Sequence, residues 1–290
     1  MNSQQQKLNI SIIIPAYNEE KSINEVVNDL KKHLPDQEII VVDDNSTDQT
    51  NQILKSINNI KVITHSENQG YGAALKTGIK QAQGKYILII DGDGTYPAES
   101  IPQMLKYIND YEMVSGVRRG KNFDARWLYA QRIGKFILKR VMVYVTKTKI
   151  PDINCGLRIF KKETIEKFWD LYPQGFSFTT TSLAAFLSNN YRVKFIPIDY
   201  HQRKEKSTLK PLKSFAAFIN LILKISLFFK PIRIFLPLSI FFFFLAIIIT
   251  VYGFVWKGVF FDTTVILISA TSLQTFFFGL LAEIIVHNRR

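Results

Sequence analysis

Two long stretches near the C-terminus contain no charged residue, and they constrain the fold of this 290-residue chain more than any other feature. They run from Ile234 to Trp256 and from Thr263 to Ala282, which are 23 and 20 residues. As helices, both are long enough to cross the roughly 30 Å hydrocarbon core of a bilayer. We therefore predict a transmembrane hairpin with helices at about 234–256 and 263–286. The alternative is a pair of soluble core helices, which rarely run this long with such phenylalanine clusters.

Basic residues around the hairpin predict its orientation. Between Tyr200 and Arg233 the sequence has eight Lys or Arg against one acidic residue, and Arg289 and Arg290 follow the second stretch. The loop between the stretches holds only Lys257 as a basic residue. Because Lys and Arg are in excess on the cytoplasmic side of membrane proteins, we expect the N-terminal part and the C-terminus to be cytoplasmic. The polar segment from Met1 to Asn9 has no apolar core of a signal peptide.

The chain is strongly basic, with 37 Lys and Arg against 24 Asp and Glu and a formal charge of +13. Nucleic acid is a poor explanation, because no basic-aromatic RNA motif and no helix-turn-helix pattern is present. The basic residues concentrate beside the apolar stretches, so anionic lipid headgroups are the expected partner. The single cysteine, Cys155, fits a reducing compartment.

The first two hundred residues alternate short β-branched runs with amphipathic stretches. Five runs predict strands: Ile10–Ile14, Glu38–Val42, Lys61–Thr64, Tyr86–Ile90 and Met113–Val117. Three stretches between them predict helices: Glu19–Leu34, Thr47–Ile57 and Gly72–Gln83. Strand, helix and strand at this spacing indicate an α/β fold with a mostly parallel sheet flanked by helices. Asn18 and Ser46 are the expected N-caps of the first two helices.

Two further segments are amphipathic and suited to a membrane surface. They are Arg118–Lys149, for which a solvated helix packed on the sheet is the alternative, and Leu212–Phe229. The predicted organisation is a cytoplasmic domain over 1–208, a juxtamembrane amphipathic segment over 209–231 and the hairpin over 232–290.

Polar side chains gather where the predicted strands end, which is where parallel sheets bind ligands. They lie in Pro15–Glu19, Asp43–Asp48 and Asp91–Pro97. Asp91 and Asp93 are two hard oxygen donors on a glycine-flanked turn, and such donors suit Mg²⁺ or Mn²⁺ bridging a diphosphate. For Asp43 and Asp44 the alternative is a turn that caps the next helix.

Other chemistries lack their motifs. Gly70, Gly72 and Gly78 superficially match a dinucleotide-binding fingerprint, but the third glycine is misplaced and the segment follows the third strand rather than the first. The sequence has no P-loop and no G-x-S-x-G elbow, and its four histidines lack metal-ligand spacing. ATPase, serine hydrolase and zinc enzyme functions therefore have no support.

The motifs, taken in order, resemble family 2 glycosyltransferases of the GT-A fold. The specific similarity is to the polyprenyl-phosphate branch, which includes dolichol-phosphate mannose synthases and bacterial undecaprenyl-phosphate glucosyltransferases. It extends from about Ser11 to Pro211. It is carried by Ile14–Glu19, Val42–Asp48, Asn68–Gly72, Asp91–Asp93, Gly116–Arg118 and Asp152–Arg158, and by Arg203 with Ser207.

The resemblance implies a role for each matching residue. The predicted nucleotide-sugar-binding residues are Pro15, Tyr17, Glu19, Asp43, Asp44, Arg203 and Ser207. Asp91 and Asp93 would hold the metal. The family's R-x-G-x-S-K segment has Glu205 and Thr208 in place of Gly and Lys here. After the D-x-D motif, Gly94 and Thr95 replace the Leu-Gln of many dolichol-phosphate mannose synthases.

The implied activity is a metal-dependent hexosyl transfer from a UDP- or GDP-linked sugar to undecaprenyl or dolichyl phosphate. An acceptor phosphate is already anionic, so it can attack the anomeric carbon directly and invert its configuration. Arg118 and Arg132 are the candidates for binding this phosphate, because Arg matches phosphate bidentately. Asp93 and Asp152 are the predicted catalytic residues, with Asp152 as base or orienter. For Asp152 the alternative is a loop carboxylate that caps Asn154 or Cys155.

Two other functions compete with this interpretation. A processive polysaccharide synthase would carry a Q-x-x-R-W motif, but Phe123 stands where Gln is required before Arg126 and Trp127. A non-catalytic membrane scaffold would be expected to lose its acidic site, which is intact. Small residues in the second apolar stretch are compatible with a homo-oligomer: Ser269, Ala270 and Ser272.

Overall fold

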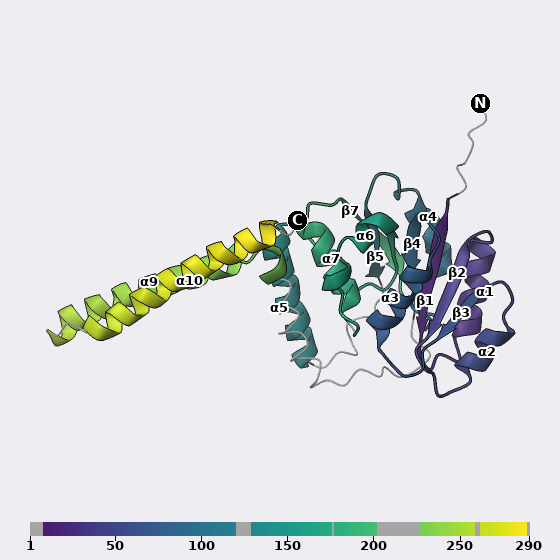
Figure 1. Cartoon of the computed structure of the whole chain (residues 1–290), viewed down its shortest axis with the longest axis horizontal. Coiled ribbons are helices and arrows are strands. Elements are labelled where there is room, and N and C mark those ends of the chain that lie inside the picture. Colours follow the sequence, from purple (N-terminus) through teal and green to yellow (C-terminus); the bar gives the residue numbers. More distant parts are fainter. Residues whose placement is uncertain (1–7, 120–128, 176, 202–226, 259–261, 289–290) are drawn as a thin grey trace, which may run out of the picture.

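The computed structural model describes residues 8–119, 129–175, 177–201, 227–258 and 262–288; the side chains of 129–135, Lys257 and Asp262 lie outside this description. Figure 1 shows an α/β domain and, projecting from one side of it, a long hairpin of two helices. The two parts expected from the sequence are therefore both present.

Seven strands form one sheet in the order β3-β2-β1-β4-β6-β5-β7. The strands are β1 (Ile10–Ala16), β2 (Glu38–Asp43), β3 (Lys61–Thr64), β4 (Tyr86–Ile89), β5 (Met113–Arg119), β6 (Arg158–Lys161) and β7 (Val193–Asp199). β6 pairs antiparallel with both of its neighbours, β4 and β5, and the other pairs are parallel. The prediction of a mostly parallel sheet is confirmed. β6 and β7 were not predicted.

Helices cover both faces of the sheet. Those of the α/β domain are α1 (Ile23–His33), α2 (Thr50–Ser56), α3 (Tyr71–Gln81), α4 (Ile101–Leu105), α5 (Tyr129–Thr146), α6 (Lys162–Glu166) and α7 (Phe178–Ser188), with short 3₁₀ turns at Ala98–Ser100 and Trp169–Leu171. The three helices predicted from the sequence correspond to α1, α2 and α3. The basic amphipathic segment contains α5.

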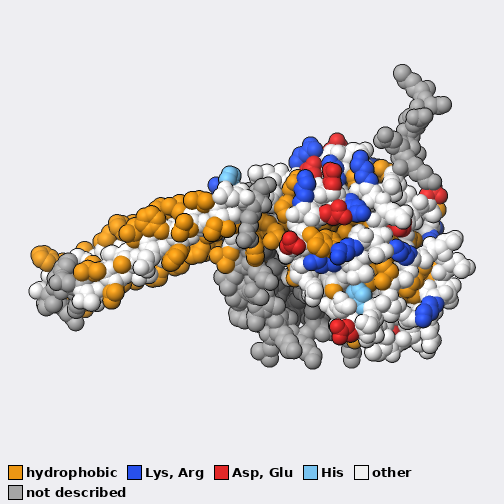
Figure 2. Space-filling model, in the orientation of Figure 1, with side chains coloured by type: hydrophobic (Ala, Val, Ile, Leu, Met, Phe, Trp, Pro, Cys, Tyr) orange, Lys and Arg blue, Asp and Glu red, His pale blue; other side chains and the backbone are white. Residues whose placement is uncertain are grey.

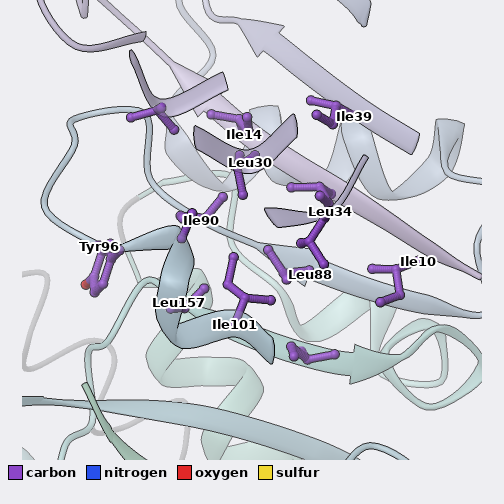
Figure 3. Packing of buried hydrophobic residues seen from close by; sticks show 14 of the residues in the cluster. Ile10, Ile14, Leu30, Leu34, Ile39, Leu88, Ile90, Tyr96, Ile101 and Leu157 are labelled. Carbon is purple, nitrogen blue, oxygen red and sulfur yellow. The ribbon is translucent and has the colours of Figure 1, made fainter. Parts of the chain in front are cut away.

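The alternation of side chains along β1 divides the core in two. Ile13 packs with α3, α5 and α7 on one face of the sheet. Ile12 and Ile14 pack with α1 and α4 on the other face, part of which is drawn in Figure 3. α7 is buried along its whole length, since it lies against the sheet and contacts α5. Both faces are thus covered, as a parallel sheet requires.

The predicted N-caps of the first two helices were wrong. α1 and α2 begin later than expected, and neither has a side-chain cap. Asn18 instead adopts a φ of +56°, and its backbone N–H donates to the hydroxyl of Ser46 at 3.0 Å. The side-chain oxygen of Asn18 accepts from the backbone N–H of Thr47 at 2.8 Å. These polar groups join the loop after β1 to the loop after β2, so they are not available as caps.

The apolar hairpin consists of α9 (Ile232–Tyr252), which continues as a π-helix over Gly253–Lys257, and α10 (Asp262–Asn288). Both helices are long and apolar enough to cross a membrane, and Figure 2 shows their surface covered with hydrophobic side chains. Ser239 and Ser272 donate hydroxyl hydrogen bonds to each other's backbone carbonyl, at 2.9 and 2.8 Å. Ser272, one of the small residues considered for packing between subunits, is therefore used inside the hairpin.

The hairpin is tied to the α/β domain at the beginning of α9. The guanidinium of Arg233 donates to the carbonyls of Tyr144 and Val145 in the last turn of α5, and the Tyr144 hydroxyl donates to the carbonyl of Arg233 at 2.8 Å. Just before α9, Phe229 is buried in the domain core. The carboxylate of Glu283 on α10 accepts from the backbone N–H of Ile232 at 3.2 Å. These contacts connect both helices to the point where the chain leaves the domain.

Close packing of α3 on the sheet gives a first test. A Cβ atom at Gly78 would lie 2.3 Å from a methyl carbon of the buried Ile13, so Gly78→Ala must displace α3 or β1. We expect the free energy of unfolding to fall by about 1 to 3 kcal/mol, the usual effect of overpacking a core. The measurement is thermal unfolding of the detergent-purified chain by circular dichroism. Gly175→Ala, where a Cβ meets nothing within 4 Å, is the control and should unfold like the wild type.

Candidate active site

The acidic segments converge at one edge of the sheet. β1, β2 and β4 are parallel neighbours and end at Ala16, Asp43 and Ile89, so the residues that follow them lie along the same edge. The hydroxyl of Ser22, just before α1, donates to the carbonyl of Gly92 in the D-x-D turn at 2.8 Å. The predicted meeting of the three polar segments is therefore present.

Asp43 shapes the loop that follows β2. Its side chain is buried and accepts hydrogen bonds from the backbone N–H of Ser46 at 3.0 Å and from the amide of Asn51 at 2.7 Å. The intervening Asn45 has a φ of +61°. The carboxylate therefore organises its own turn, as in the alternative considered from the sequence, but it does not cap α2, which has no side-chain cap. Ligand binding by Asp43 remains a prediction.

Asp44 holds the segment that leads into α3. Its buried carboxylate accepts from the backbone N–H groups of Gln69 and Gly70, at 2.9 and 2.7 Å, and lies 2.7 Å from Nδ1 of His65. The other ring nitrogen of His65 is 2.9 Å from the hydroxyl of Thr77 on α3. Asp44 thus fixes the position of the turn at residues 69–70 beside the sheet edge.

The other predicted nucleotide-binding residues lie at the end of β1. Pro15 is buried within the strand, and Tyr17 is half-buried just after it. Glu19 is 6% exposed, and its backbone N–H donates to the hydroxyl of Thr50 on α2 at 2.9 Å. The structure therefore brings Pro15, Tyr17 and Glu19 to the same edge as Asp43 and Asp44.

The two carboxylates of the D-x-D turn are oriented by different neighbours. Asp91 accepts a hydrogen bond from the hydroxyl of Tyr71 on α3, at 2.8 Å. Asp93 is 9% exposed and accepts from both the backbone N–H and the hydroxyl of Thr95, at 3.1 and 2.6 Å. Gly94, between Asp93 and Thr95, has a φ of +73°, a conformation that glycine adopts without strain. The departure from Leu-Gln at 94 and 95 therefore has a local structural role.

Arg118 and Asp152 form a bidentate ion pair on the side of the D-x-D turn away from β1 and β2, since β6 and β5 follow β4 in the sheet. Nε and Nη2 of Arg118 donate to the two carboxylate oxygens at 2.7 and 2.8 Å, and the side chains are only 7% and 10% exposed. The guanidinium also lies over the ring of Tyr200, 5.4 Å from its centroid. The next residue, His201, donates its backbone N–H to the carbonyl of Thr95 at 2.9 Å. The pair is thereby placed next to the metal-binding candidates.

The ion pair determines the protonation of both groups. Burial alone raises the pKa of Asp152, but hydrogen bonds and charge from Arg118 outweigh burial and hold that pKa below its ordinary value. For Arg118 burial alone lowers the pKa, and the neighbouring Tyr96 and Asp152 raise it overall. Asp152 also accepts from the backbone N–H of Asn154 at 3.0 Å, the capping contact considered as its alternative. This environment favours an orienting carboxylate over a proton acceptor.

A buried arginine beneath the site was not identified from the sequence. Arg158 is completely buried and donates to the carbonyls of Ile153, Cys155 and Thr179 and to the hydroxyl of Ser182. Burial lowers its pKa. Burial also raises the pKa of the Cys155 thiol, to about 12. Arg158 belongs to a motif segment of the resemblance, but nothing in the sequence separates its supporting role from a role in binding.

Several predicted positions lie outside the described residues. They are Arg203 and Ser207, most of the amphipathic segment over 212–229, and the domain boundary between 208 and 209. Arg132 belongs to α5, but its side chain is not among those described.

The carboxylates of Asp91 and Asp93 suit a divalent metal that is shared with a ligand. Within the described part of the chain, no group of three or more His, Cys, Asp or Glu side chains could hold a metal ion. Mg²⁺ and Mn²⁺ sites of this kind use one or two protein carboxylates and complete their coordination with water and phosphate oxygens. The donor set therefore fits the predicted cofactor.

Comparison with known proteins identifies the family. The sequence model described as glycosyl transferase family 2 matches residues 11–169, which include all the acidic segments of the site. The chain belongs to glycosyl transferase family 2. A second model, described as the GtrB C-terminal hairpin, matches residues 230–287 and covers both apolar helices.

Several relatives align with much of the length of this family 2 glycosyltransferase. An uncharacterised protein of Methanocaldococcus jannaschii is 32% identical over 68% of this chain and 84% of its own length. A dolichyl-phosphate hexose transferase of Haloferax volcanii is 26% identical over 75% and 94%. A UDP-N-acetylglucosamine dolichyl-phosphate N-acetylglucosaminyltransferase of Methanococcus voltae is 33% identical over 54% and 71%.

Solved structures share the fold. Glucosyl-3-phosphoglycerate synthase of Mycobacterium tuberculosis, crystallised with Mn²⁺, UDP and glucosyl-3-phosphoglycerate, superposes with a TM-score of 0.58. The match covers 76% of this chain and 79% of that chain at 17% sequence identity. The glycosyltransferase fold predicted from the motifs is confirmed by this similarity.

The buried ion pair gives a second test. Arg118→Met leaves Asp152 buried without its partner, so we expect the free energy of unfolding to fall by about 3 to 5 kcal/mol, as when one partner of a buried pair is removed. Thermal unfolding at pH 7 measures this loss.

The lowered pKa of Asp152 also predicts how stability depends on pH. Its contribution to the free energy of unfolding is complete above the ordinary carboxyl pKa of about 3.9 and is lost as the pH falls through the lower pKa of the folded state. Thermal unfolding between pH 3 and 7 measures this dependence. Equal pH dependence in the wild type and Asp152→Asn would contradict this account.

Proposed function

We propose that the enzyme transfers a sugar from a UDP- or GDP-linked donor to polyprenyl phosphate at the cytoplasmic face of a membrane. The observation that carries this proposal is the joining of an acidic family 2 site to an apolar helical hairpin. The domain and the hairpin are connected through Arg233 and Tyr144. Two relatives are named as dolichyl-phosphate sugar transferases, which supports a lipid-linked acceptor.

The donor is proposed to bind along the edge formed by β1, β2 and β4. Pro15, Tyr17 and Glu19 would contact the nucleoside together with Asp43 and Asp44. Asp91 and Asp93 would hold Mg²⁺ or Mn²⁺ on the diphosphate, where a divalent cation stabilises the charge that develops on the leaving group. The Mn²⁺ and UDP in the superposed mycobacterial enzyme are compatible with this arrangement. Arg203 and Ser207 would contribute further phosphate contacts.

The acceptor is proposed to approach from the side of Arg118 and Asp152. Arg118 remains cationic, and with Arg132 it would bind the acceptor phosphate. Asp152 would orient Arg118 through the bidentate pair rather than remove a proton. A phosphate oxygen that is already anionic needs no strong base to attack the anomeric carbon, and direct displacement inverts the configuration.

The hairpin gives the site access to its acceptor. A polyprenyl tail stays in the bilayer, so an enzyme acting on its phosphate must work at the membrane surface. α5, which is joined to the start of α9, exposes Phe136 and Ile137, and Arg140 lies over the ring of Phe136. An exposed apolar and basic surface beside the hairpin suits contact with lipid headgroups and acyl chains.

The metal-binding role of Asp93 is tested by Asp93→Ala. Loss of one of two carboxylate ligands should lower the release of nucleoside diphosphate by at least about 100-fold, since a catalytic metal contributes several kcal/mol to transition-state stabilisation. The assay supplies membranes with undecaprenyl phosphate, Mn²⁺ and a panel of UDP- and GDP-sugars, which also identifies the donor. Glu99→Ala, an exposed acid just beyond the turn, is the control. Unchanged turnover in a folded Asp93→Ala enzyme would overturn the metal assignment.

The orientation is tested with a single introduced thiol. Cys155 is fully buried and should not react with a membrane-impermeant maleimide, whereas a cysteine in place of the exposed Gly258 would report the loop between α9 and α10. In sealed right-side-out vesicles, Gly258→Cys should be labelled without detergent. Gln52→Cys on the exposed surface of α2 should be labelled only after the vesicles are opened. The reverse pattern would contradict a cytoplasmic active site.

A further inference from the structure

The carboxylate of Asp91 is contacted by two segments that lie outside the D-x-D turn. The hydroxyl of Tyr71 donates to Oδ1 at 2.8 Å. Gly156 lies against the same carboxylate, and a Cβ atom there would come within 2.3 Å of Oδ2 and 2.8 Å of Oδ1. The carboxylate therefore contacts both a hydrogen-bond donor and a backbone that leaves no room for a methyl group. Its orientation depends on both neighbours.

Tyr71 is itself placed by a well-fixed backbone. It is the first residue of α3 and follows Gly70, which has a φ of +97° and donates its N–H to Asp44 at 2.7 Å. On its other side, a Cβ at Gly72 would meet the carbonyl oxygen of Pro173 at 2.2 Å, and the N–H of Ala73 donates to a neighbouring carbonyl at 2.7 Å. The segment can therefore move little, and the Tyr71 hydroxyl is delivered to a defined position.

The backbone at Gly156 is held as firmly as that at Tyr71. Its backbone N–H donates to the hydroxyl of Tyr96 at 2.7 Å. The loop before it is bound by the buried guanidinium of Arg158, which donates to the carbonyls of Ile153 and Cys155 at 3.1 and 3.0 Å. The two contacts on Asp91 thus come from rigid parts of the domain, so Asp91 can hold one orientation before any ligand arrives.

We propose that Tyr71 is a positioning residue for the metal-binding carboxylate of Asp91, an inference that rests on the proposed metal site. A carboxylate that ligates a metal binds it more tightly when a hydrogen bond fixes its orientation. Tyr71 supplies that bond from α3, while the adjacent Gly70 supports Asp44 at the proposed nucleoside site. One turn of the chain therefore positions two of the carboxylates that would contact the donor, Asp44 and Asp91.

The test is direct Mn²⁺ binding to the purified full-length chain, followed by the loss of the electron paramagnetic resonance signal of aqueous Mn²⁺. Titrations are made with no nucleotide, with UDP and with GDP. Tyr71→Phe keeps the ring and removes only the hydroxyl, and we expect its Mn²⁺ dissociation constant to rise between about 10- and 100-fold, as for other groups that orient metal ligands. In turnover assays the apparent KM for Mn²⁺ should rise similarly, with kcat at saturating Mn²⁺ within about threefold of the wild type.

Tyr86→Phe is the matched control. Tyr86 is a buried tyrosine whose hydroxyl donates to Asn109 at 3.1 Å, and it lies at the opposite end of β4 from the D-x-D turn. This variant removes the same kind of bond away from the site, so its Mn²⁺ affinity should match the wild type.

The outcomes separate this inference from the proposed function. Unchanged Mn²⁺ affinity in Tyr71→Phe, with the affinity lost in Asp91→Asn, would overturn the role of Tyr71 and leave the metal site intact. Unchanged affinity in Asp91→Asn, or no binding by the wild type, would overturn the metal site itself. If Tyr71→Phe does not fold, Tyr71→Met, which also lacks the hydroxyl, takes its place in the titration. Gly156→Ala then tests separately whether the orientation of the Asp91 carboxylate matters, because its methyl group would displace that carboxylate. Wild-type Mn²⁺ affinity in either variant would overturn the inference.

Discussion

The burial of carboxylates at one sheet edge is the constraint on which the site depends. The ends of β2 and β4 carry four acidic side chains, of which Asp43, Asp44 and Asp93 are buried. Removing a carboxylate from water costs several kcal/mol unless hydrogen bonds or charges compensate for the lost hydration. Backbone N–H groups or hydroxyls accordingly donate to Asp44, Asp91 and Asp93. The loops around the site take their shape from this requirement.

The local parts of the fold were predictable from the sequence, because they depend on neighbouring residues. The β-branched runs locate five strands to within two residues at their ends, and the uncharged stretches locate the hairpin. The D-x-D turn follows directly from its strand. β6 was missed because it inserts antiparallel between β4 and β5, which local sequence does not indicate.

The partners of individual side chains were much less predictable. Asn18 and Ser46 have the residue types of N-caps, yet they bond to each other's loops because β1 and β2 are adjacent in the sheet. Arg118 and Asp152 were assigned separate roles, whereas the pairing of β5 with β6 brings the segments that contain them together. Tyr71 and Asp91 are 20 residues apart and meet only across the sheet edge. Such contacts depend on the order of the strands in the sheet, which local sequence patterns do not indicate.

The central claim is that Asp91 and Asp93 hold a divalent metal against the donor diphosphate. The most direct measurement is anomalous diffraction from crystals of the full-length enzyme grown with Mn²⁺ and a nucleoside diphosphate. The account predicts one strong manganese peak at coordinating distance from both carboxylates, with the diphosphate on its other side. A nucleotide bound at the edge of β1 and β2 with manganese absent from the D-x-D turn, or located elsewhere, would contradict it.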